Sequence, residues 1–206
     1  GSALGDGGDK EAAAELLRRA VEHAPGDFWI QSRLGEFAAD SDVAHGADTA
    51  VEHLTAALAL RPTSAGAYNN LGVALWKKRD FDGAAVAFRE AIHLDPNEAL
   101  FHANLGLVLG EKGDVDGSIA AYRESVRVAP DATVSCHIGN ALCEKGDLDG
   151  AIAAFREVIR VDPTFAPAYA SLAAALGKTG DVGGAIAACR EAIRLDPNLA
   201  LAHTNL

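Results

Sequence analysis

Residues 65–96 read AGAYNNLGVALWKKRDFDGAAVAFREAIHLDP, and the spacing of their apolar residues predicts two consecutive helices. The first half carries apolar or small residues spaced i, i+3, i+4 and i+7: Tyr68, Leu71, Gly72 and Leu75. That spacing places these residues on one face of an α-helix. We therefore predict a first helix whose apolar face packs against a neighbouring element.

The second half of this stretch has its own start and stop signals. Asp80 is a candidate N-cap, because its carboxylate can accept a hydrogen bond from a free amide of the first helical turn. Pro96 ends the helix after Asp95, since proline cannot continue a helix and disfavours the helical conformation of the preceding residue. Between these two signals lies a second apolar face: Ala84, Phe88, Ala91 and Ile92.

The same pattern recurs along the chain with a period of about 34 residues. Six of the seven prolines follow one another at nearly this spacing: Pro25, Pro62, Pro96, Pro130, Pro163 and Pro197. The pair Arg-Glu recurs in step with them, beginning at Arg89, Arg123, Arg156 and Arg190. A fixed period of this length is typical of a repeat protein, in which each repeat packs on its neighbours.

The period divides the chain into five complete repeats, which we assign to residues 28–64, 65–98, 99–131, 132–165 and 166–199. Residues 9–27 are predicted to be the orphan second helix of a preceding repeat, and residues 200–206 the start of a truncated further repeat. The chain opens with Gly1 and Ser2 and contains no Met, which indicates that residues 1–8 are a tag scar and a flexible start. We therefore expect a piece of a longer array.

Small residues recur at two fixed positions of every repeat. In the first helix they are Gly35, Gly72, Gly106, Gly139 and Ala173. In the second helix they are Ala50, Ala84, Ser118, Ala151 and Ala185. Because the distance between two packed helices depends on the side chains at their contact, we expect these residues to be buried where helix backbones approach closely.

With these positions set, residues 9–206 resemble the tetratricopeptide repeat (TPR) family, whose helix–turn–helix repeat has Leu-Gly, Ala, aromatic, Ala and Pro residues at fixed places. The resemblance implies an all-α fold, a right-handed α-solenoid without strands. Two repeats depart from the pattern. Repeat 28–64 has three extra residues around Ser41–Thr49, which should bulge a loop outward. Repeat 99–131 is one residue short near Pro130–Ala132, which should change the local stacking angle.

The composition favours a folded protein whose partner is another protein. Of the 206 residues, 49% are hydrophobic and 23% are charged, whereas a disordered chain has fewer apolar residues and a larger charge excess. The net charge of −11 argues against nucleic acid or an anionic membrane as a partner, because their phosphates repel an acidic surface. No apolar run approaches the ~20 residues of a membrane helix. Three cysteines, Cys136, Cys143 and Cys189, are too few for a disulfide framework, so we expect a reducing, cytoplasmic location.

No motif predicts a catalytic residue, a cofactor site or a metal site. The sequence Gly-Lys-Thr at 177–179 resembles the end of a phosphate-binding loop, but the glycine required five residues earlier is Leu172. The seven histidines form no i, i+4 pair and have no attendant cysteine spacing, so we expect no zinc. N-capping explains the Asp-x-Asp-Gly turns, which lack the further ligands of a calcium loop and begin at Asp80, Asp114 and Asp147. We therefore expect a protein that is not an enzyme.

The remaining candidate site is a surface on the first helices, which in the TPR family lines the concave side of the superhelix. The matching positions carry the candidate peptide-binding residues Asn69, Asn70, Val73, Trp76, Lys77, Asn104, Leu107, Glu111, Cys136, His137, Asn140 and Ser171. Asn70, Asn104 and Asn205 share one position, which resembles the asparagine ladder of O-GlcNAc transferases, and His137 and Ser171 interrupt it. An amide both donates and accepts hydrogen bonds, so it matches a peptide backbone of any sequence. The alternative is that these asparagines tie neighbouring helices together.

The resemblance implies a non-catalytic scaffold that binds a protein or an extended peptide in this groove. Because few fixed charges line this surface, we expect the peptide to be largely uncharged or mildly basic. Two alternatives stay open: a structural spacer or oligomerisation array without a groove ligand, and the substrate-recruiting arm of a kinase or glycosyltransferase. Residues 17–20, 25–29 and 54–62 are similar to repeat arrays that follow the kinase domain of bacterial serine/threonine protein kinases. We also expect open solenoid ends to favour end-to-end self-association, through Ile186, Ile193 and Leu201.

Overall fold

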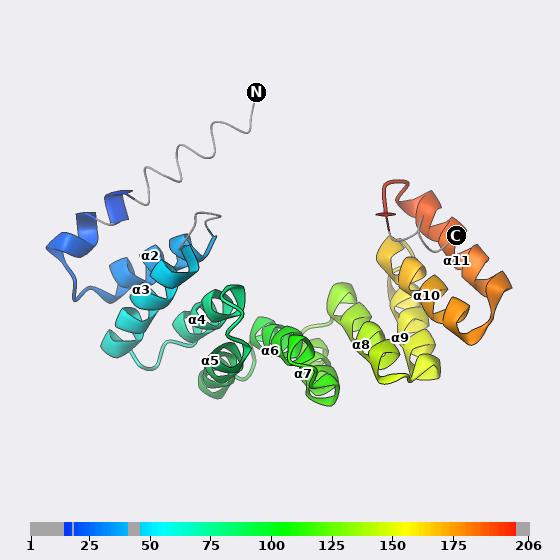
Figure 1. The fold of residues 1–206 in the computed structure, drawn as a ribbon, viewed down its shortest axis with the longest axis horizontal. Coiled ribbons are helices and arrows are strands. Elements are labelled where there is room, and N and C mark those ends of the chain that lie inside the picture. Colours follow the sequence, from blue (N-terminus) through cyan, green and yellow to red (C-terminus); the bar gives the residue numbers. More distant parts are fainter. Residues whose placement is uncertain (1–14, 18, 41–45, 201–206) are drawn as a thin grey trace, which may run out of the picture. The chain divides into compact units, whose positions relative to one another are not determined.

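The computed structural model describes residues 15–17, 19–40 and 46–200, and within these ranges the chain forms helices and turns without a strand. Helices α2 to α11 follow one another along the chain (Figure 1). Their bounds are α2 Phe28–Asp40, α3 Gly46–Leu60, α4 Ala65–Lys77, α5 Phe81–Leu94, α6 Ala99–Glu111, α7 Val115–Val128, α8 Ala132–Lys145, α9 Leu148–Val161, α10 Ala166–Thr179 and α11 Val182–Leu195. None of the described helices is long and apolar enough to cross a membrane.

Aspartate side chains cap the start of the second helix in four repeats. The Oδ1 atom of Asp80 accepts a hydrogen bond from the amide of Gly83 at 3.0 Å. The same bond forms at 2.9–3.0 Å at the starts of α7, α9 and α11, where the caps are Asp114, Asp147 and Asp181. Each carboxylate pairs an amide that the helix leaves free and lies at the positive end of the helix dipole. The N-capping predicted from the Asp-x-Asp-Gly turns is confirmed.

The connections between repeats differ in length at the place where the sequence is one residue short. Four residues connect α3 to α4, α5 to α6 and α9 to α10, whereas the three residues 129–131 connect α7 to α8. The last of these three is Asp131, whose side chain caps α8 by accepting a hydrogen bond from the amide of Val134 at 2.9 Å. The loop predicted around Ser41–Thr49 falls largely on residues 41–45, which lie outside the described residues.

The helices pack with their neighbours in sequence and form two compact blocks. Contacts join α2 to α3 and α3 to α4, and they join α8, α9, α10 and α11 in the same consecutive way. The first block ends at Asn104 and the second begins at Leu105, so both take part of α6. The first block comprises residues 1–104 and the second block residues 105–206.

Within each repeat, a small residue of the first helix faces a larger residue of the second. A Cβ atom added to Gly139 would lie 2.4 Å from the Cε1 atom of the fully buried Phe155. In the last repeat the matching residues are Ala173 and Cys189. The second helix has no aromatic ring at this position, and the first helix has a methyl group in place of glycine. The predicted close approach of the helices is confirmed, and it recurs at Gly35–Leu54, Gly72–Phe88 and Gly106–Tyr122.

The small residues of the second helices are buried, as the sequence predicts. They are Ala50, Ala84, Ser118, Ala151 and Ala185. Ser118, which is a serine among alanines, satisfies its hydroxyl by donating a hydrogen bond to the carbonyl oxygen of Gly106 at 2.8 Å. The fixed phase of these residues therefore reflects helix packing in every repeat.

We expect Ala151→Leu to destabilise the protein by about 1–3 kcal/mol, because a larger side chain at a position with no exposed surface overpacks the contact. Chemical denaturation followed by circular dichroism measures the effect. Ala153→Leu is the matched control, since Ala153 lies on the same helix with its side chain exposed and should change stability by less than about 0.5 kcal/mol. Equal unfolding midpoints for the two variants would mean that Ala151 does not face the helix contact.

The C-terminal end of the described chain retains some apolar surface. Ile186 is 36% exposed, whereas Ile193 is half-buried in a cluster with Tyr169, Ala170, Ala192 and Leu199. Leu201, the third residue expected to leave apolar surface open, lies outside the described residues.

Candidate functional site

The candidate asparagines of the first block form a hydrogen-bonded row across three successive first helices. Asn70 of α4 donates from Nδ2 to the Oε1 atom of Glu36 on α2 at 3.0 Å. Its own Oδ1 atom accepts a hydrogen bond from Asn69 at 3.3 Å. Asn104 of α6 donates to the Oδ1 atom of Asn69 at 2.8 Å. Each bond between helices therefore joins side chains that lie about one repeat apart in sequence.

This row occupies much of the hydrogen-bonding capacity that a peptide ligand would use. Asn69 is buried, and both its oxygen and its nitrogen are bonded to other asparagines. Asn70 and Asn104 are half-buried. A bond from a buried amide to a side chain on the next helix holds the two helices in register, since breaking it would leave a polar group unsatisfied. In the first block the asparagines thus tie neighbouring helices together.

The other candidate residues of the first block lie on α4. Val73 and Trp76 are half-buried, and Lys77 is exposed. The Nζ atom of Lys77 donates a hydrogen bond to the carbonyl oxygen of Ala39 near the end of α2. The next residue, Lys78, forms an ion pair with Asp48 of α3 at 2.6 Å. Both lysines therefore join α4 to the preceding repeat.

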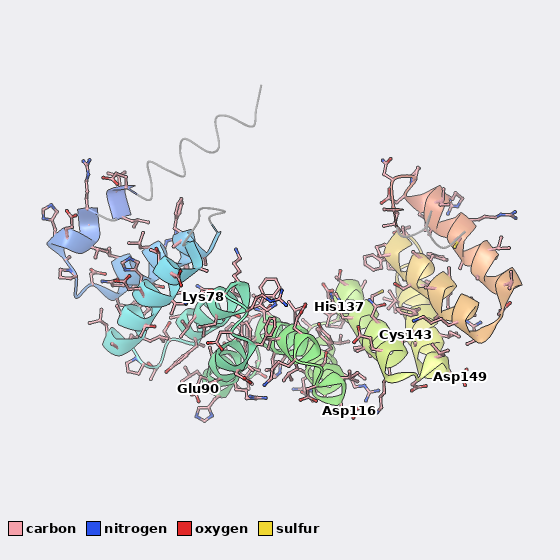
Figure 2. All side chains as sticks on the ribbon, in the orientation of Figure 1. Lys78, Glu90, Asp116, His137, Cys143 and Asp149 are labelled. Atoms are coloured by element: carbon pink, nitrogen blue, oxygen red, sulfur yellow. The ribbon has the colours of Figure 1, made fainter. Side chains whose placement is uncertain are left out.

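In the second block, four of the candidate residues line one pocket of about 380 Å³: Leu107, Glu111, His137 and Asn140. The first two belong to α6 and the last two to α8, and α7 contributes Ser118 and Tyr122. The imidazole of His137 stacks on the ring of Tyr122, with ring centroids 5.3 Å apart and planes 19° apart. Figure 2 labels His137 on α8, together with Cys143 further along the same helix. Stacked rings form one wall of the pocket.

The pocket has two carboxylates at its edge and a phenol in its stacked wall. Glu111 and Glu144 both line it, and both side chains are exposed. Burial raises the pKa of Tyr122 to about 12, a hydrogen bond with Ser118 lowers it, and the charges of Glu144 and Glu111 raise it. The phenol is therefore uncharged at neutral pH, and two carboxylates set the charge that a ligand meets.

The remaining candidates, Cys136 and Ser171, do not line this pocket, and neither does Cys143. Cys136 lies in the hydrophobic core, where burial raises the pKa of its thiol to about 11. Cys143 is half-buried, and its pKa is raised chiefly by burial, with Lys178 acting in the opposite direction. A thiol with a raised pKa is a weak nucleophile and a weak metal ligand. Ser171 is half-buried on α10.

Sequence reasoning missed the residues that α7 contributes to the pocket. Tyr122 and Ser118 occupy the aromatic and small positions of a second helix, and those positions predict packing inside the repeat. One sequence feature could have indicated the role of Tyr122. In the next repeat, His137 stands at the position that is asparagine in the two repeats before it. A flat imidazole at that position can stack on a ring below it, whereas an amide cannot fill the same area.

Within the described ranges, no three side chains of histidine, cysteine, aspartate or glutamate lie close enough together to hold a metal ion.

Models of two repeat families described as tetratricopeptide repeat match the chain, one at residues 44–99 and 74–133 and the other at residues 166–199. A third model, described as TPR repeat, matches residues 139–180. A search of curated proteins found no match.

Solved structures with the same fold include YrrB, described as a TPR protein with an unusual peptide-binding site. It is 21% identical, with a TM-score of 0.72 over 93% of this chain and 97% of its own. MamA is 28% identical, with a TM-score of 0.71 over 75% of this chain and 90% of its own. PilF from Pseudomonas aeruginosa is 20% identical, with a TM-score of 0.74 over 97% of this chain and 90% of its own. These similarities confirm the predicted all-α solenoid class.

Proposed function

Because this chain belongs to the tetratricopeptide repeat family, we propose that it is a non-catalytic scaffold that binds an extended segment of a partner protein on its first helices. Proteins of this family bind proteins or peptides and typically carry no catalytic site of their own. YrrB, which shares the fold, has a peptide-binding site, and this is consistent with the proposal.

The pocket between α6 and α8 carries this proposal, because it gathers residues of three useful kinds. Leu107 is 36% exposed and offers apolar contact, and Asn140 is exposed and offers an amide that can both donate and accept. Glu111 and Glu144 add negative charge at the same pocket. This combination suits a peptide backbone with an apolar side chain and either no charge or a basic residue nearby.

Selection from a random peptide library, followed by calorimetry on the best binder, tests the proposal. We expect Asn140→Ala to weaken binding by about 0.5–1.5 kcal/mol, because one amide contact is lost. His137→Ala should weaken binding by a similar or larger amount, since it removes the stacked wall above Tyr122. Asn198→Ala is the matched control: Asn198 is also exposed, but it lies in the turn after α11.

Binding at full affinity by both pocket variants would remove the support for a ligand in this pocket. A salt titration adds a second criterion. Because the proposed ligand carries little charge, raising the salt concentration should change its affinity only weakly. A collapse of binding in moderate salt would instead implicate the exposed acidic surface of the protein.

A structural role is a second candidate for the first block, and the hydrogen-bonded row from Glu36 to Asn104 favours it. The same peptide assay separates the two roles. If the row and the half-buried Trp76 serve only to hold helices together, Asn104→Ala and Trp76→Ala will lower the melting temperature and leave peptide affinity unchanged. If these residues bind the ligand, both variants will lose affinity.

A further inference from the structure

A second pocket of the 105–206 block lies where α7, α8 and α9 meet. Its volume is about 410 Å³, and its walls are largely apolar. Val126 of α7, Ile138 of α8 and Val158 and Val161 of α9 form these walls, together with Pro130 in the connection before α8. The side chain of Ser135, also on α8, lines the pocket beside these apolar walls. None of these residues belongs to the pocket that holds His137.

The repeat that follows has a tyrosine where this repeat has Ser135. Tyr169 of α10 is the counterpart of Ser135 one repeat later, and it packs in a cluster with Ala192, the counterpart of the wall residue Val158. The hydroxyl of Tyr169 donates a hydrogen bond to the carbonyl oxygen of Pro163 at 3.2 Å. In the last repeat, therefore, a phenol fills the place that the pocket occupies in the repeat before it.

Two other repeats fill the matching position in the same way. The Nε2 atom of His102 donates to the carbonyl oxygen of Pro96 at 2.9 Å. The Nε2 atom of Gln31 donates to the carbonyl oxygen of Pro25, also at 2.9 Å. As with Tyr169, the donor lies six residues after the proline. Each of these repeats thus supplies a sizeable side chain and a hydrogen-bond donor for the proline carbonyl.

Ser135 supplies neither a sizeable side chain nor a hydrogen-bond donor for the proline carbonyl. Its hydroxyl donates instead to the carbonyl oxygen of Asp131, the N-cap residue four positions earlier, at 2.8 Å. The proline of this turn, Pro130, is only five residues away, because the connection before α8 is one residue shorter than its counterparts. Across the described residues, no side-chain donor reaches the carbonyl oxygen of Pro130. The result is a largely apolar space with the carbonyl oxygen of Pro130 at its edge.

The charges at the edge limit which ring can enter. Asp131 and Glu157 both line the pocket. Glu157 forms an ion pair with Arg160 at 2.6 Å, whereas the Asp131 carboxylate accepts a hydrogen bond from the amide of Val134. An aromatic ligand that carries its own carboxylate would add a third negative charge, which this surface repels. A neutral or cationic ring meets no such cost.

We propose that this pocket binds a small molecule with one aromatic ring system, a hydrogen-bond donor and no negative charge, such as a phenol or an indole. The ring takes the place that Tyr169 occupies in the next repeat, and its donor faces the carbonyl of Pro130. Burial of an apolar ring in an apolar pocket supplies the affinity, and the donor sets the orientation.

Ligand-observed NMR and calorimetry with three related probes test the chemistry. We expect p-cresol and tyramine to bind, and 4-hydroxyphenylacetate to bind about tenfold more weakly because of its carboxylate. Chemical-shift mapping should place the response on residues 126, 132, 135 and 158. The proposal is overturned if neither p-cresol nor tyramine binds up to about 5 mM. It is also overturned if 4-hydroxyphenylacetate binds as tightly as the other two probes, or if the chemical-shift changes are centred on His137.

Filling the pocket provides the matching variant. Ser135→Tyr should abolish probe binding. The helical circular dichroism spectrum should stay the same, and the melting temperature should stay the same or rise. Thr133→Tyr is the control, because Thr133 is exposed on the same helix outside the pocket, and this variant should bind the probes like the wild type. A folded Ser135→Tyr variant that still binds would overturn the assignment. If that variant does not fold, the shift mapping on the wild type decides.

Discussion

Replacing Phe155 by alanine is expected to lower the free energy of unfolding by about 3–5 kcal/mol, the largest loss from a single substitution that we foresee. Phe155 has no exposed surface and packs against the backbone of α8 at Gly139, where even a methyl group would not fit. Removing the ring leaves a space that α8 and α9 cannot close without losing their other contacts. Urea denaturation monitored by circular dichroism measures the loss.

The matching position of the next repeat provides the control for Phe155→Ala. Cys189 is also fully buried, but it has only one heavy atom beyond Cβ. Cys189→Ala should therefore cost about 1 kcal/mol, in line with the smaller apolar volume that is removed. A loss at Phe155 no larger than the loss at Cys189 would contradict the packing described here.

Leu54→Ala should destabilise the first block by about 2–5 kcal/mol. Leu54 has no exposed surface and takes the place of the aromatic ring in its repeat, where a Cβ atom on Gly35 would lie 2.5 Å from its Cγ atom. It belongs to a cluster with Ala50 and Ala74, so its loss weakens contacts among α2, α3 and α4.

The effect of Leu54→Ala is expected to stay local, because each repeat contacts mainly its neighbours and stability spreads along such chains through neighbouring interfaces. Hydrogen exchange should accelerate in α2–α5 more than in α8–α11. The control is Thr55→Ala on the same helix, whose exposed side chain only donates to the carbonyl of Val51. An equal acceleration in α8–α11 would show that the two blocks unfold together.

The repeat pattern was readable from the sequence because it reports which side of each helix is buried. A proline that ends a helix, an aspartate that starts one and an alanine that permits close approach each act within a few residues or on one helix face. Asp80, Ala84 and Gly72 therefore have the roles that their spacing predicts. The fold class and the packed faces followed from these local rules.

The hydrogen-bond partners of the polar side chains could not be predicted from the sequence. Sequence alone left two roles open for the asparagines, because an amide can bond equally well to a peptide or to a neighbouring helix. The tertiary structure gave these asparagines partners in the first block, where Asn104 bonds to Asn69 and Asn70 bonds to Glu36, and this favours the structural role. In the second block it brought Tyr122 from α7 under His137, a contact that no first-helix pattern contains.

The sequence by itself determined the period, the two helices of each repeat and the residues between them, because burial and capping depend on local spacing. It also located the missing residue near Pro130. Only the tertiary structure gave the consequence of that short turn and of Ser135, which is a pocket where other repeats place Tyr169 or His102. The physical reason is that a cavity depends on three helices at once, and the sequence pattern of one helix does not specify the space that its neighbours leave unfilled.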